Sequence, residues 1–175
     1  MHTNTLNCSI IALSPSFQLD NEGVEPFTKK GAFNISELKR QYPKFTFKNI
    51  SDPNDGSPIL QVYLSDHISL SVRYDKSGAT ALSVVGQGVK TKNGIKIGSR
   101  LAELKKADSS LGCRVSQNVL LVECQDSKNQ NIIYFADRPN GVSAFDDPEV
   151  VNAKWNLVKG QNIIEILWLP QHINR

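Results

Sequence analysis

The segment from residue 68 to residue 75 reads Ile68-Ser69-Leu70-Ser71-Val72-Arg73-Tyr74-Asp75. Apolar and polar side chains alternate along it, which is the pattern of a strand with one face buried and the other in water. Short polar segments join it to apolar runs at 59–64 and 80–85, and both connections are short enough for hairpins. A helix is expected just before these strands, because Asn34 can cap its first turn and Pro43 stops it. The first half is therefore predicted to form a helix followed by a three-stranded antiparallel meander.

The same order of elements recurs in the second half. A second short helix is expected around Leu101 and Leu104, with Ser99 as its cap, before strands at 119–124, 131–136 and 163–169. Gly31 matches Gly94, and Glu37-Leu38-Lys39 matches Glu103-Leu104-Lys105. The sequence predicts an α+β fold, in which an antiparallel sheet of about six strands carries two short helices on one face. It also predicts a tandem αβββ repeat, with units at 31–87 and 88–175 of one domain.

Residues 1–30 show no sustained period, and we expect them to form a loosely ordered N-terminal arm. The longest apolar run there, Ile10-Ile11-Ala12-Leu13, is too short for the core of a signal peptide. No segment approaches the roughly 20 apolar residues that span a bilayer as a helix. The chain is accordingly expected to be either cytosolic or a processed or trimmed form.

The charge distribution and the polar motifs argue against nucleic-acid binding, catalysis and phosphate binding. The 20 basic and 17 acidic residues are interspersed and leave a net charge of only +3, so no nucleic-acid partner is expected. His67 follows Asp66 in a hairpin turn, where a solvated histidine is a simpler interpretation than a catalytic one. The segment 86–91, with its Gly-x-Gly, lacks the spacing of a phosphate-binding loop. We therefore expect no catalytic residues and no cofactor, with a hydrolase using Asp66 and His67 as the weaker alternative.

The long connection at 137–162 is the candidate contact surface. Asp146 and Asp147 could hold a hard cation, but acids at a helix start explain them more simply, and no metal site is expected. Trp155 lies in this connection rather than on a strand. Phe145, Asp146, Asp147 and Trp155 are the predicted partner contacts.

The three cysteines are Cys8, Cys113 and Cys124, and no Cys or His cluster has zinc-ligand spacing. Cys113 and Cys124 bracket a short turn-and-strand segment. From the residues alone, a disulfide and two buried free thiols are equally acceptable.

An ordered set of features in the second half resembles the sigma-E (RpoE)-regulated lipoprotein family of Gram-negative bacteria, a domain of unknown function. The features are Gly94-Ile95-Lys96-Ile97-Gly98-Ser99 with Leu104, Gly112-Cys113, Val122-Glu123-Cys124, Ile132-Ile133-Tyr134-Phe135, the Trp155 segment, and Ile163-Ile164-Glu165-Ile166-Leu167-Trp168. The resemblance is clearest over 88–169 and weaker over 31–87.

The resemblance implies a non-catalytic, periplasm-facing domain, tethered to the outer membrane by a lipidated cysteine and acting in the envelope stress response. It favours a Cys113–Cys124 disulfide, because disulfides persist in an oxidising compartment. Cys8 is a weak match for the lipidated residue, because Asn7 stands where a small residue is expected. The expected partner is an envelope protein, peptidoglycan or lipid. The alternative is a secreted inhibitor-like protein that grips an enzyme with its sheet.

Overall fold

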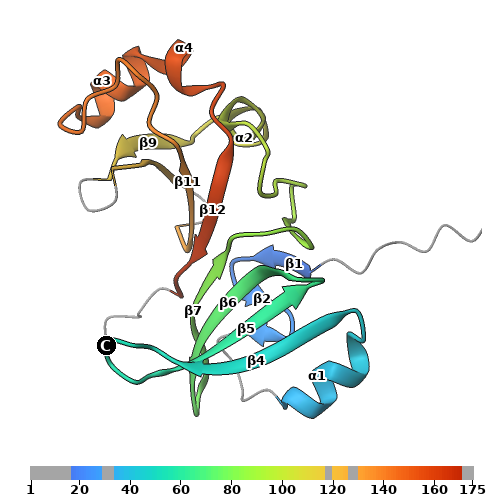
Figure 1. The fold of residues 1–175 in the computed structure, drawn as a ribbon. Coiled ribbons are helices and arrows are strands. Elements are labelled where there is room, and N and C mark those ends of the chain that lie inside the picture. Colours follow the sequence, from blue (N-terminus) through green and yellow to red (C-terminus); the bar gives the residue numbers. More distant parts are fainter. Residues whose placement is uncertain (1–16, 29–33, 117–119, 126–129, 171–175) are drawn as a thin grey trace, which may run out of the picture.

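The computed structural model describes residues 17–28, 34–116, 120–125 and 130–170. Its main element is an eight-stranded sheet in which all neighbouring strands are antiparallel (Figure 1). In spatial order the strands are β4 (Phe45–Ser51), β5 (Pro58–Leu64), β6 (His67–Asp75), β7 (Gly78–Val84), β12 (Ile163–Trp168), β11 (Ile132–Ala136), β10 (Val122–Gln125) and β9 (Gly112–Val115). The last strands of the two halves, β7 and β12, pair at the centre of the sheet.

A smaller, four-stranded sheet packs against the first. Its order is β3 (Phe27–Thr28), β2 (Gly23–Val24), β1 (Phe17–Asp20) and β8 (Val89–Thr91), and β1 runs parallel to β8. The prediction of a loose arm over residues 1–30 is therefore wrong for residues 17–28, where Phe17, Leu19 and Phe27 are buried in the core. Residues 1–16 of that arm lie outside the described residues.

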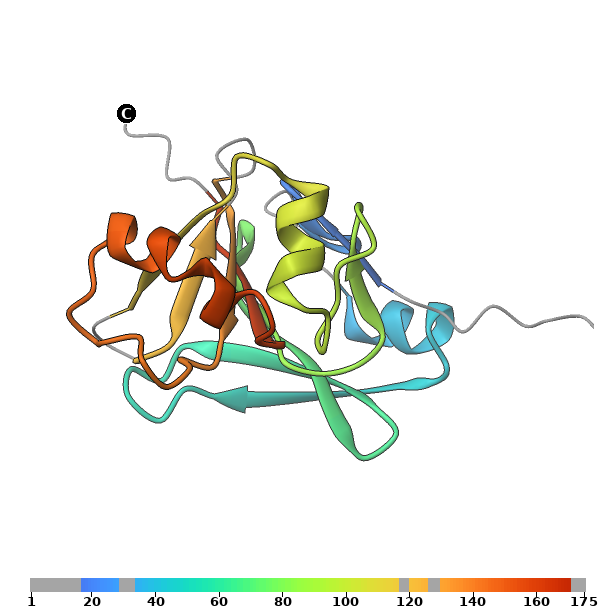
Figure 2. The same ribbon diagram turned by 90° about the horizontal axis from the view of Figure 1, so that it is seen from above.

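Among the described residues, four short helices accompany the sheets: α1 (Ile35–Gln41), α2 (Leu101–Ala107), α3 (Pro148–Ala153) and α4 (Trp155–Val158). The predicted cap of α1 is confirmed, because the Asn34 side chain accepts hydrogen bonds from the backbone N–H groups of Ser36 and Glu37. The predicted cap of α2 is wrong, because Arg100 occupies that position and makes no side-chain capping bond. In both views α1 lies on the opposite side of the molecule from α3 and α4 (Figures 1 and 2).

The predicted fold of about six strands, two helices and a tandem αβββ repeat is wrong. Within the described residues each of the helices α1 and α2 is followed by four strands of the large sheet, not three. The strands of the large sheet that the prediction missed are β4, which alternates from Phe45 onward, and β9, which has only 4 residues. Two further helices, α3 and α4, fill the connection before β12.

One face of the large sheet carries the hydrophobic core. Val72, Leu82, Trp168 and Ile132 lie opposite one another across four adjacent strands and are all buried. Such cross-strand stacking of apolar side chains is the main source of stability in a sheet of this kind. Both sheets contribute to a single cluster of buried side chains, so the small sheet and the large one stabilise each other.

Candidate functional site

The disulfide predicted from the family resemblance is present. Cys113 on β9 lies directly opposite Cys124 on β10, with an S–S distance of 2.05 Å and a Cα–Cα distance of 4.1 Å. The Ser116 N–H donates to the Leu121 carbonyl at 2.9 Å, so these two residues form a hydrogen-bonded pair. Hydrogen-bonded and non-hydrogen-bonded pairs alternate along an antiparallel ladder, and Cys113 and Cys124 therefore form a non-hydrogen-bonded pair. Strands approach most closely at such non-bonded pairs, which explains how a disulfide can bridge them.

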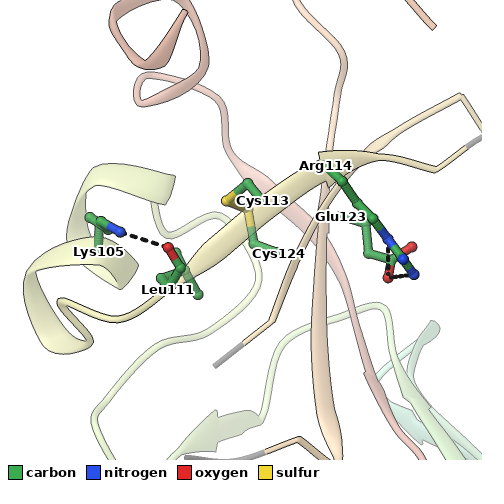
Figure 3. The surroundings of a disulfide bond; sticks show 6 residues. All are labelled: Lys105, Leu111, Cys113, Arg114, Glu123 and Cys124. Atoms are coloured by element: carbon green, nitrogen blue, oxygen red, sulfur yellow. Dashed lines mark hydrogen bonds and ion pairs between the residues drawn. A yellow bond between two sulfur atoms is a disulfide. The ribbon is translucent and has the colours of Figure 1, made fainter. Parts of the chain in front are cut away.

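Around the disulfide, charged side chains occupy the opposite face of the two strands (Figure 3). Arg114 donates from Nε and Nη2 to Glu123 Oε1, at 3.2 and 2.7 Å. The Arg114 side chain is 62% exposed, whereas that of Glu123 is 11% exposed, so Arg114 covers a nearly buried carboxylate. At the start of β9, Lys105 on α2 donates to the Leu111 carbonyl at 2.6 Å and joins this end of the sheet to the helix.

Two hollows of about 520 and 500 Å³ lie beside this ion pair. Both are lined by Arg114, Glu123 and Pro148, so we treat them together as the β9 trough. The second hollow is also lined by Phe145 and Asp147, from the connection that precedes α3. The trough therefore lies between the last strand of the sheet and the turn at 143–147.

This turn is held in place by hydrogen bonds from both sides. Asp146 accepts hydrogen bonds from the Ser143 N–H at 2.8 Å and from the Lys154 ammonium at 2.7 Å. The bonds from Lys154 and from the Ser143 N–H hold the pKa of the Asp146 carboxyl below its ordinary value. Asp147 accepts a hydrogen bond from the Val150 N–H at 2.8 Å and caps α3. Both acids thus have structural partners within the turn.

The four predicted partner contacts consequently differ in what they can offer a partner. Phe145 is 88% exposed, although its backbone N–H is fixed by the Ser143 hydroxyl at 3.2 Å. Trp155 is half-buried and packs against the core from α4. Of these four side chains, Phe145 is the exposed apolar one. The sequence pattern indicated the connection at 137–162 as a contact surface. It could not show that Phe145 is exposed whereas Trp155 packs against the core.

The weaker catalytic candidates, Asp66 and His67, lie at the start of β6. Asp66 lies in the turn between β5 and β6, and His67 is the first residue of β6. Both are exposed, and no hydrogen bond between their side chains is found among the described residues. They border a hollow of about 640 Å³, whose lining includes Leu64, Ile68 and Ile97. Among the described residues, no group of three or more His, Cys, Asp or Glu side chains could hold a metal ion. Cys8 lies outside the described residues.

Glycine is required at one point near the 640 Å³ hollow. A Cβ atom on Gly86 would lie 2.2 Å from the Ile68 carbonyl oxygen, so no side chain fits there. The Ser69 carbonyl accepts the N–H groups of both Val85 and Gly86 and holds the end of β7 against β6. The Gly-x-Gly segment thus serves a close approach of two backbones.

Comparison with known proteins gives a fold but no function. No family model matches the sequence, and no curated protein matches it either. The fold is similar to that of the uncharacterized protein YfeY from Escherichia coli. The TM-score is 0.61, with 15% sequence identity, and the match covers 88% of this chain and 99% of that chain. At this identity the likeness concerns the fold alone. None of the helices in the described chain is long and apolar enough to cross a membrane.

Proposed function

We propose that the protein is a non-catalytic binding or accessory module of the bacterial envelope, facing the periplasm and acting in the envelope stress response. The proposal includes membership of the sigma-E (RpoE)-regulated lipoprotein family, for which the motifs between residues 94 and 168 are the support. The partner is another envelope protein, peptidoglycan or lipid, and it contacts the turn at 143–147 together with the β9 trough.

The observation that carries the binding role is the position of Phe145. An aromatic ring that is 88% exposed gains apolar burial only when a partner covers it. The ring also stands on a turn held by Asp146, Lys154 and Ser143, so little conformational freedom is lost on binding. Beside it, Arg114 keeps part of its guanidinium free of Glu123 and can donate to a polar group of the partner. Rigid aromatic and arginine side chains are the residues that most often dominate protein interfaces.

The disulfide supports the compartment. Disulfides persist in the periplasm and are rare in the cytosol, where thiols are kept reduced. The bond between Cys113 and Cys124 braces β9, which forms one wall of the trough. The disulfide therefore stabilises one wall of the proposed contact surface.

Photo-crosslinking in cells tests the proposal. A photoreactive phenylalanine analogue placed at position 145, in the protein expressed from its natural gene, is expected to give a discrete crosslinked species in the envelope fraction. The matched control is the same analogue at Leu157, which is also exposed but lies on α4. Crosslinks of equal yield from both positions, or none from position 145, would contradict a partner at this turn.

An inhibitor-like protein remains the second candidate, in which a concave sheet face grips a loop of an enzyme. It predicts that the protein appears in the culture medium rather than in a membrane fraction, and that it binds one enzyme tightly. Fractionation of the same cells separates the two functions.

A further inference from the structure

The large sheet ends in two edge strands that differ in what lies beside them. One edge is β9, and α3 packs beside it. The other edge is β4, which lies at the boundary of the sheet with α1 at one end (Figure 1). Among the described residues, no strand pairs with the outer side of β4. An open edge presents unpaired backbone N–H and C=O groups to any extended chain that approaches it.

The register of β4 shows which backbone groups point outward. Its 7 residues pair with β5 without a bulge, and the ladder continues to Asp52, whose N–H donates to the Ser57 carbonyl at 2.8 Å. Because hydrogen-bonded pairs alternate, the groups of Phe47, Asn49 and Ser51 are directed away from β5. Phe47 is buried, whereas Asn49 and Ser51 are exposed. No backbone hydrogen bond to Asn49 or Ser51 is found within the described chain.

The surface at the α1 end of this edge is basic, and the two acids that follow β4 at its other end, Asp52 and Asp55, are both paired with Arg73. Four basic side chains are exposed along this surface: Lys39 and Arg40 on α1, Lys44 in the turn after it, and Lys48 on β4. The one acid of α1, Glu37, lies 3.8 Å from Arg40. An acidic chain approaching β4 would therefore meet a complementary charge.

We propose that β4 binds an extended, acidic segment of a partner protein, which adds to the sheet as a ninth strand. This inference rests on the proposed function and deepens it, because it names a second contact surface and the chemical class of the partner. Backbone hydrogen bonds to Asn49 and Ser51 supply the pairing, and the basic residues select the acidic chain. A second copy of this chain fits less well, because its own β4 edge carries the same exposed basic residues, including Lys48.

The test uses the purified protein and a fluorescent peptide of about ten residues in which Glu and Val alternate. Asn49→Pro removes an outward N–H that β5 does not use, so the strand itself is retained. Asn49→Ala is the matched control, because it loses the same side chain and the bond from Tyr74 but keeps the N–H. The Pro variant is expected to bind the peptide at least about tenfold more weakly than the Ala variant. A peptide with Lys in place of Glu is expected to bind more weakly than the Glu peptide.

A second readout does not depend on the Pro variant folding. In the native protein the amides of Asn49 and Ser51 should exchange with solvent faster than those of Lys48 and Ile50, and the Glu-Val peptide should slow them. Slow exchange without peptide would mean that another part of this chain covers the edge, and would overturn the proposal. So would equal binding to the Pro and Ala variants, equal binding of the Lys peptide, no binding at all, or self-association that Asn49→Pro abolishes. Phe145→Ala should leave peptide binding unchanged, so failure here is distinguishable from failure of the crosslink at position 145.

Discussion

Removal of the disulfide is predicted to cost a large part of the stability of the domain. The two cysteines are 11 residues apart, and a closed loop of this size lowers the entropy of the unfolded chain by about 9 cal/mol/K. At room temperature this corresponds to about 3 kcal/mol of stability, out of a total of roughly 5–15 kcal/mol for a domain. The midpoint of thermal unfolding should then fall by roughly 6–12 °C for a chain of this length.

The variant that tests this value is Cys113→Ala/Cys124→Ala, because replacing one cysteine alone would leave a buried free thiol. Cys8→Ala is the control for the loss of a cysteine outside the disulfide. Urea unfolding followed by circular dichroism gives the free energy of unfolding of each protein. A double variant whose free energy of unfolding lies within about 1 kcal/mol of the wild type would contradict this value, since the entropy of loop closure alone exceeds it.

Three further predictions concern the turn at 143–147 and Gly86. Phe145→Ala should change the free energy of unfolding by less than about 0.5 kcal/mol, because the ring is exposed, whereas Trp168→Ala in the core should cost about 3–5 kcal/mol in the same urea titration. Gly86→Ala should destabilise by about 1–3 kcal/mol through the contact with the Ile68 carbonyl, whereas Gly112→Ala, where a Cβ meets nothing within 4 Å, should be nearly neutral. The hydrogen bonds from Lys154 and Ser143 lower the pKa of Asp146 in the folded state. The Asp146 carboxylate therefore stabilises the protein at pH values above its unfolded pKa of about 4. This stabilisation is lost as the pH falls through the lower folded pKa. The stability difference between wild type and Asp146→Asn should therefore be present at neutral pH and shrink in acid; a difference that grows below pH of about 4 would contradict this sign.

Sequence pattern located most of the large sheet but not its extent. The alternation at 68–75 correctly placed β6, and the apolar runs beside it placed β5 and β7. The same alternation was present at Phe45 and Phe47 of β4, and at Phe17 and Leu19 of β1, where the following Asp-Asn-Glu-Gly is typical of a turn. These strands were predictable in principle.

Other features depend on tertiary structure and leave no local signal. The irregularity between Phe135 and Ala136 shifts the pairing of β11 with β12, so that Ile163 is buried and Ile164 is exposed. Strict alternation counted from Trp168 would have placed Ile164 on the buried face. Similarly, the sequence predicted Asp146 as an acid at a helix start, whereas Asp147 caps α3 and the packing of α3 brings Lys154 within 2.7 Å of Asp146. The β9 trough depends on the position of this turn beside β9 and could not be derived from spacing.

The proposed function depends most on the domain working in a compartment where its cysteines are oxidised. The direct measurement is thiol trapping, in which cells expressing the protein from its natural gene are quenched in acid and treated with an alkylating reagent that adds mass. We predict that Cys113 and Cys124 take up the reagent only after reduction of the denatured protein. Labelling of both cysteines without reduction would show free thiols in the cell and contradict the proposed location.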